Sequence, residues 1–139
     1  MNPIFEHIYS GDLEQLKTAF LNTTTINQFD ENGMTLLAFA SAKSPNAGIL
    51  SFLIDSGADI NLKDAHGMTP LMYASMMNPN IEITDLLLES GARLSDKDEN
   101  GMTALLWAAK ENENPAVCNL LLDCGADVTE RDNKFNLNA

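Results

Sequence analysis

The residues that most resemble a ligand set lie in one acidic segment of the second half of the chain. Asp96, Asp98, Asn100 and Gly101 match the first half of an EF-hand loop, in which oxygen ligands on alternating residues surround a calcium ion. The twelfth position of such a loop requires a bidentate glutamate, and this sequence has Trp107 there. We therefore expect neither a calcium site nor any other metal site.

The histidines, cysteines and carboxylates are not spaced as nucleophilic or acid–base catalysis would require. His7 and His66 are the only histidines, and neither has a cysteine or a second histidine at ligand or nucleophile spacing. General acid–base catalysis also needs a pocket that shifts a pKa. We interpret the clustered carboxylates as a solvated acidic face: Glu82, Asp85, Glu89, Glu111 and Glu113. The sequence predicts a protein that is not an enzyme and uses no cofactor.

The cysteines and the start of the chain bear on the compartment. Cys118 and Cys124 fall on one expected helix, about 9 Å apart at ~1.5 Å per residue, beyond the ~7 Å between Cα atoms that a disulfide spans. Residues 1–12 lack the basic and apolar regions of a signal peptide, and the apolar stretch at 49–54 is too short to cross a membrane. We expect reduced thiols and a cytoplasmic protein.

The net charge of the chain limits the classes of partner that we expect it to bind. The chain has 139 residues with 8 Lys and Arg against 20 Asp and Glu, which gives a net charge of −12. Such a protein is repelled by phosphate backbones and by anionic membranes, so we expect neither nucleic-acid nor membrane binding. With 45% hydrophobic and 20% charged residues, residues 1–139 are predicted to form one folded domain.

Two series of glycines recur with a period of 34 residues. The first series is Gly33, Gly67 and Gly101 in DENGMTLL, DAHGMTPL and DENGMTAL, and the second is Gly57, Gly91 and Gly125 in SGADIN, SGARLS and CGADVT. A glycine after D-x-x predicts a tight turn with positive φ, and the threonine two residues later predicts a helix N-cap. Each second-series glycine is expected to end a helix. The sequence therefore consists of repeated turn-and-helix units.

Each unit is predicted to contain two helices. Small residues on the first helix, at 40, 74 and 108, allow neighbouring helices to approach closely. Asparagine, which suits a helix cap or a turn, and proline mark the junction at 45–46, 79–80 and 114–115. The second helix has apolar residues at i, i+3 and i+4, which predicts a buried stripe: Ile49, Phe52, Leu53, Ile83, Leu86, Leu87, Val117, Leu120 and Leu121.

These motifs together resemble the ankyrin-repeat family over nearly the whole chain. The resemblance implies an all-α solenoid of stacked helix-turn-helix units joined by β-turn loops. It divides the chain into an N-terminal half-repeat at 1–29, full repeats at 30–63, 64–97 and 98–131, and the start of an incomplete repeat at 132–139. The histidine that braces the turn in this family is missing from all three full repeats, so we expect softer turns.

Two ladders of apolar residues occupy equivalent positions in the three full repeats. Met34, Met68 and Met102 follow the turn glycine, at a position that the resemblance places in solvent on the concave edge. Phe39, Tyr73 and Trp107 share a position on the first helix that borders the same groove, although ordinary packing between repeats is an alternative. Flexible methionines are common at adaptable binding surfaces.

We predict from the resemblance a non-catalytic module that binds a partner protein in this concave groove. The expected partner has apolar anchors and basic flanks, and weak self-association through the C-terminal end is a second expectation. The alternatives are a structural fragment of a longer ankyrin-repeat protein whose activity lies outside this chain and, less favoured, an enzyme subunit. The predicted partner-binding residues are Glu31, Asn32, Met34, Phe39, Ala65, His66, Met68, Tyr73, Glu99, Asn100, Met102 and Trp107.

Overall fold

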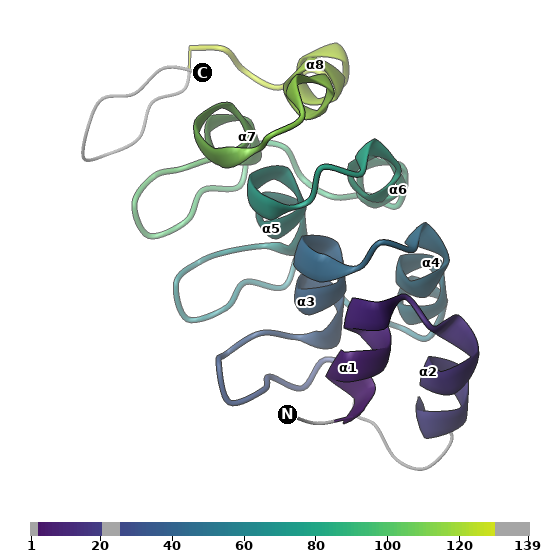
Figure 1. The fold of residues 1–139 in the computed structure, drawn as a ribbon. Helices are drawn as coiled ribbons and strands as arrows, with labels where there is room; N and C mark the ends of the chain where they lie inside the picture. The colour runs from purple at the N-terminus through teal and green to yellow at the C-terminus, as the bar shows by residue number, and fades with distance from the viewer. Residues whose placement is uncertain (1–2, 21–25, 130–139) are drawn as a thin grey trace.

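A computed structural model describes residues 3–20 and 26–129, and these residues form eight α-helices and no strand (Figure 1). The incomplete repeat predicted at 132–139 lies outside them. The helices are α1 (Pro3–Ser10), α2 (Leu13–Phe20), α3 (Leu36–Lys43), α4 (Ala47–Asp55), α5 (Pro70–Met77), α6 (Ile81–Glu89), α7 (Ala104–Glu111) and α8 (Pro115–Asp123). This confirms the predicted all-α repeat fold, and the region predicted as a half-repeat contains the pair α1 and α2.

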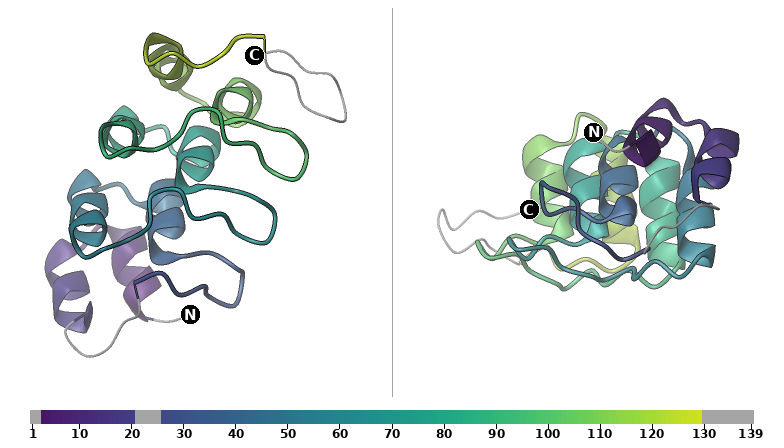
Figure 2. Two further views of the ribbon diagram at one scale, coloured as in Figure 1. Left: turned by 180° about the vertical axis from the view of Figure 1, so that it is seen from behind. Right: turned by 90° about the horizontal axis from the view of Figure 1, so that it is seen from below.

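The helices form two layers with long loops on one side. The first helix of each pair (α1, α3, α5, α7) lies in one layer and the second (α2, α4, α6, α8) in the other. The loops that precede α3, α5 and α7 project from the first layer, away from the second, as both views in Figure 2 show. The turn tips and the first helices therefore form the side of the molecule that faces away from the second layer.

Capping side chains define where the helices begin. Thr35, Thr69 and Thr103 accept hydrogen bonds from the backbone N–H three residues later, at 3.1, 3.3 and 3.3 Å, and so cap the first helices. Asn46, Asn80 and Asn114 cap the second helices by accepting from the N–H two residues later, at 2.9, 3.1 and 3.0 Å. Both sets of predicted caps are confirmed, and each satisfies a backbone donor that the helix leaves open.

One turn glycine is required for two separate reasons. Gly67 has φ of +77°, a conformation that side chains rarely adopt. A Cβ at this position would also lie 3.1 Å from the Cα of Asp98 and from the N of Glu99 in the next turn. Neighbouring turns therefore pack backbone to backbone at this point.

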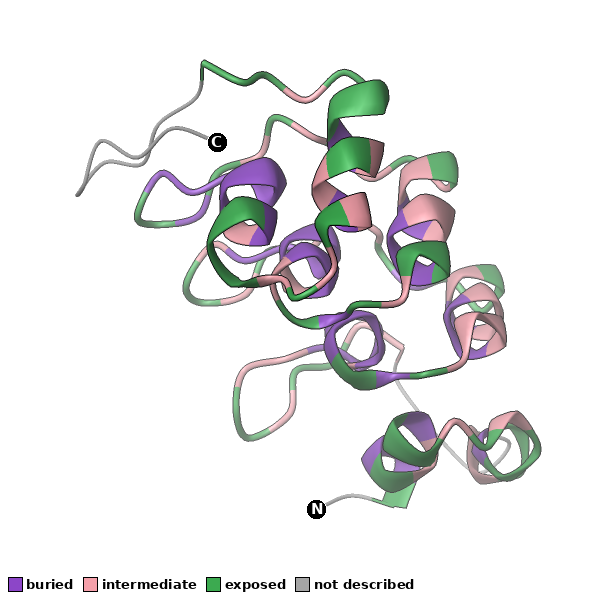
Figure 3. Ribbon diagram, turned by 45° about the horizontal axis from the view of Figure 1, so that its top comes forward, coloured by how far each residue is buried: buried purple, intermediate pink, exposed green. Residues whose placement is uncertain are grey.

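The core lies between the two helix layers and between successive repeats (Figure 3). Six of the nine residues in the predicted stripe of the second helices have no exposed surface: Ile49, Leu53, Ile83, Leu87, Val117 and Leu121. The other three, Phe52, Leu86 and Leu120, are partly buried. On the first helices, the small side chains of Ala40, Ala74 and Ala108 are buried where α3, α5 and α7 pack against one another. Burial of these apolar side chains stabilises the fold.

Two asparagine side chains, one buried and one partly buried, connect the second and third full repeats to the repeats before them. The Nδ2 group of Asn78 donates to the carbonyl oxygens of Ser41 and Ser44, at 3.1 and 3.0 Å. Asn112 repeats the arrangement one repeat later, donating to Ser75 at 2.8 Å and to Asn78 at 3.0 Å. These bonds satisfy carbonyls that would otherwise be left unpaired at the ends of α3 and α5.

The asparagines that cap the second helices make the same kind of connection. Besides accepting with Oδ1, they donate with Nδ2 to the preceding repeat: Asn46 to Gly11 at 3.0 Å, Asn80 to Pro45 at 3.4 Å and Asn114 to Pro79 at 2.8 Å. The sequence predicted the caps but not these bonds between repeats. Each of these amides therefore both starts a helix and joins two repeats.

Candidate protein-binding surface

The turn tips carry six of the predicted partner-binding residues. All six are exposed: Glu31, Asn32, Ala65, His66, Glu99 and Asn100. An aspartate at the base holds each tip, because one of its carboxylate oxygens accepts two backbone hydrogen bonds. In the central turn, Asp64 accepts from the N–H groups of His66 and Met68, at 2.9 and 3.0 Å. Asp30 and Asp98 hold their turns in the same way.

An aromatic side chain braces two of the turns from the first helix. Tyr73 donates its hydroxyl to the second carboxylate oxygen of Asp64, nine residues earlier. Trp107 donates its indole N–H to the second oxygen of Asp98, at 2.9 Å. These bonds supply braces where the family's histidine is missing and where we expected softer turns. The ring donor at this register is the signal that sequence reasoning overlooked.

The first full repeat lacks this brace. Phe39 occupies the equivalent position but has no donor, and its ring instead packs edge to face on Phe5 of α1, with the centroids 5.0 Å apart. Burial and the hydrogen bond to Asp64 raise the pKa of Tyr73, so that its phenol stays protonated. All three rings are partly buried, so packing between repeats accounts for part of their surface.

The prediction that the methionine ladder points into solvent is wrong. Met68 and Met102 retain only 6% and 3% of their surface, and Met34 is half-buried. The reason is the geometry of the turn. The Met68 N–H donates to the Asp64 side chain, and its carbonyl accepts from the Asp64 N–H at 3.1 Å, which places this residue at the base of the turn and not at its tip.

Neighbouring tips also contact each other. The Glu99 N–H donates to the His66 carbonyl at 3.0 Å, and His66 Nδ1 lies 3.1 Å from Glu99 Oε1. His66 therefore contacts the neighbouring tip through both its backbone and its side chain. The second and third tips are held in a fixed relation by this contact.

The exposed face of the first helices extends this surface toward the junctions between helices. Lys43, Met77 and Glu111 occupy one register there and are all exposed. Lys110 places its ammonium 5.5 Å from the centre of the Trp107 ring, a cation–π contact. This face therefore combines apolar and charged groups, and sequence reasoning did not identify it.

The candidate ligand and thiol side chains do not form a cluster within the described residues. Within residues 3–20 and 26–129, no three His, Cys, Asp or Glu side chains come together to hold a metal ion. Both oxygens of Asp98, the central residue of the calcium-like segment, accept hydrogen bonds from the chain. Cys118 and Cys124 are free thiols, and burial raises the pKa of Cys118, which keeps it protonated and poorly nucleophilic. None of the described helices is long and apolar enough to cross a membrane.

Comparison with known proteins returns one family. A family model described as ankyrin repeats (3 copies) matches residues 4–98 and, in a second match, 41–132. No curated protein matches the sequence. The matched ranges include the turn tips, the braces and the exposed face of the first helices.

Proposed function

We propose that this chain, which belongs to the ankyrin-repeat family, binds a partner protein along the turn tips and the adjoining face of its first helices. Repeats of this family are generally protein–protein interaction modules and are typically not catalytic. The observation that carries the proposal is the row of six exposed tip residues held by aspartates at their base. A surface that is already ordered loses little conformational freedom when a partner binds.

The surface determines what the partner should carry. Glu31 and Glu99 add negative charge to the tips of a chain whose net charge is −12, which favours a partner with basic flanks. Partly buried Phe39, Tyr73 and Trp107 offer apolar contacts behind the tips. Met34 is half-buried, whereas Met68 and Met102 are buried and support the surface only through packing.

The test compares two double variants with the same change in charge. In the tip variant, Glu31→Lys is combined with Glu99→Lys. In the control, Asp55→Lys is combined with Glu89→Lys, at exposed sites in the last turns of α4 and α6, where a positive charge suits the helix dipole. Partners are captured from the source cell with the parent chain and identified by mass spectrometry, and their affinities for both variants are then measured.

We expect the tip variant to bind the partner at least tenfold more weakly than the parent, and the control to bind within about threefold of it. Loss of affinity should be largest at low salt and should act mainly through the association rate. Equal binding by the parent and the tip variant would show that the partner uses another face. Unfolding curves of both variants confirm that the fold is intact.

A further inference from the structure

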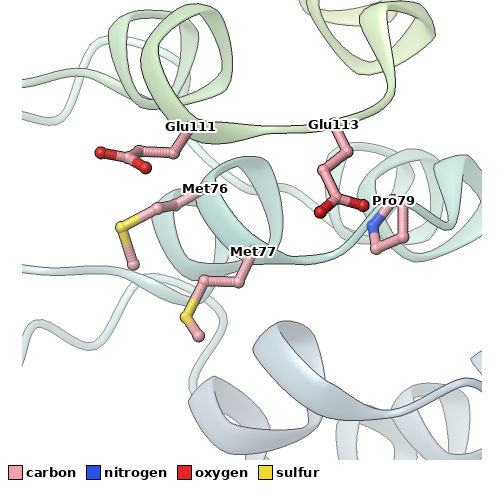
Figure 4. Close-up of a pocket in the computed structure, with 5 residues that line it drawn as sticks. All are labelled: Met76, Met77, Pro79, Glu111 and Glu113. Carbon is pink, nitrogen blue, oxygen red and sulfur yellow. The ribbon is translucent and has the colours of Figure 1, made fainter.

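The geometry points to a receptor site for an arginine or lysine side chain of the partner, in a pocket between the ends of α5 and α7. The inference rests on the proposed function and adds an anchor point to it. The pocket is an open depression with a volume of about 370 Å³, and it is lined by Met76, Met77, Pro79, Glu111 and Glu113. Figure 4 shows the two glutamates on the α7 side and the methionines and proline on the α5 side.

The walls of this pocket are held in place by the amides that join the repeats. Glu113 lies between Asn112 and Asn114, and both asparagines bond to the preceding repeat. Asn112 donates to Ser75 and Asn78 next to the methionines, and Asn114 donates to the Pro79 carbonyl at 2.8 Å. The backbone of Glu113 is therefore fixed opposite Pro79 before any ligand arrives.

The electrostatics favour a cation. Glu111 and Glu113 are exposed, and neither side chain makes an ion pair or a hydrogen bond within the described residues. The nearest lysine in sequence, Lys110, lies against the Trp107 ring. The last residues of α5 and of α7 also line the pocket, so the negative ends of two helix dipoles lie beside it and favour a bound cation.

The apolar part of the lining suits a long aliphatic stem. Met77 is 40% exposed and Met76 is partly buried beside it, so two flexible thioethers cover the floor. Arginine and lysine place methylene stems on such surfaces and keep the charged group at the polar edge. The combination of methionine floor and carboxylate rim fits such a side chain better than an apolar or an acidic one.

The preceding junction provides an internal comparison. One repeat earlier, the positions of Met77 and Glu111 are occupied by Lys43 and Met77, and the position of Glu113 by Pro79. The junction between α3 and α5 therefore has a lysine and no carboxylate at these three positions. A basic side chain is recognised at the junction between α5 and α7 and not at the one before it.

The experiment uses the full chain with methionine methyl groups labelled for NMR. The probes are the blocked peptide acetyl-Ala-Leu-Arg-Leu-Ala-amide, its citrulline analogue, which has nearly the same shape without the charge, and its glutamate analogue. Glu111→Gln with Glu113→Gln removes the rim charge. Asp55→Asn with Glu89→Gln is the control, because it removes the same charge from exposed sites elsewhere.

We expect the arginine peptide to shift the methyl signals of Met76 and Met77 saturably. The citrulline peptide and the rim variant should each raise the dissociation constant at least threefold, and the control variant less than twofold. Equal titrations by the arginine, citrulline and glutamate peptides, or no saturable shift, would overturn the inference. The peptide comparison needs only the parent chain, so it stands even where the rim variant misfolds.

The outcome separates this inference from the proposed function. In one outcome, a captured partner loses affinity for the tip variant but binds the rim variant as well as it binds the parent. That result supports the proposed function and contradicts the inference of a receptor site in the pocket. A partner that binds the tip variant as tightly as the parent contradicts the proposed function, whatever the result of the peptide titrations.

Discussion

Asn78 is the residue whose replacement most directly tests the connection between repeats. It is 4% exposed, and its amide makes three hydrogen bonds: two to Ser41 and Ser44 and one from the Asn80 N–H, at 3.0 Å. At about 0.5–1.5 kcal/mol each, these bonds predict that Asn78→Ala lowers the free energy of unfolding by about 2–4 kcal/mol. The two carbonyls left unpaired near the interior place the expected value in the upper part of that range.

Urea unfolding followed by far-UV circular dichroism and by Trp107 fluorescence measures this change. Asn78→Asp keeps the shape and the acceptor but replaces the donating group with oxygen, so it should destabilise at least as much as alanine at neutral pH. Asn119→Ala is the control, because Asn119 is exposed on α8 and its side chain makes no hydrogen bond to the described residues. A loss below about 0.5 kcal/mol for Asn78→Ala would refute the assignment of these bonds as a structural connection.

The remaining predictions concern the core, a titrating brace, metal independence and the C-terminal end. Leu87→Ala should cost about 2–5 kcal/mol in urea unfolding, because Leu87 has no exposed surface and its removal leaves a cavity. The raised pKa of Tyr73 means that the fold favours its neutral form, so its contribution is complete below pH about 10 and is lost as the pH rises toward the raised pKa. The melting temperature should therefore fall more between pH 9 and 11 for the parent than for Tyr73→Phe. Addition of EDTA should leave the circular dichroism spectrum and the melting temperature unchanged, and a lower melting temperature would contradict the prediction of a metal-free fold. Leu122 is 39% exposed, and Leu122→Glu should abolish any rise of light-scattering mass with concentration.

The sequence predicted the repeat architecture well because period and chemistry agree at each position. The caps at Thr69 and Asn80 and the turn at Gly67 follow from local chemistry that acts over a few residues. The orientation of Met68 could not be predicted in the same way. A shared register shows that residues in different repeats are equivalent, but it does not show which way their side chains point.

The missed features all depend on pairs of residues that are far apart in the chain or unlike in the repeats. The brace from Tyr73 to Asp64 exists only because the aromatic residue in that repeat carries a donor. The pocket joins Met76 and Met77 of one repeat to Glu113 of the next, at positions that are not equivalent. The brace is visible in an alignment of the repeats only if the donor on the ring is considered, and the pocket does not appear in such an alignment at all.

The amides at the helix junctions join the repeats in one direction, and this affects how such a chain can be lengthened or rearranged. The donors are side chains of the later repeat, as in Asn80, Asn112 and Asn114, whereas the acceptors are backbone carbonyls of the earlier one. Backbone carbonyls are present whatever the sequence. A 34-residue unit duplicated by recombination therefore carries the donor side chains that bond to the repeat before it. The preceding repeat needs no matching substitution.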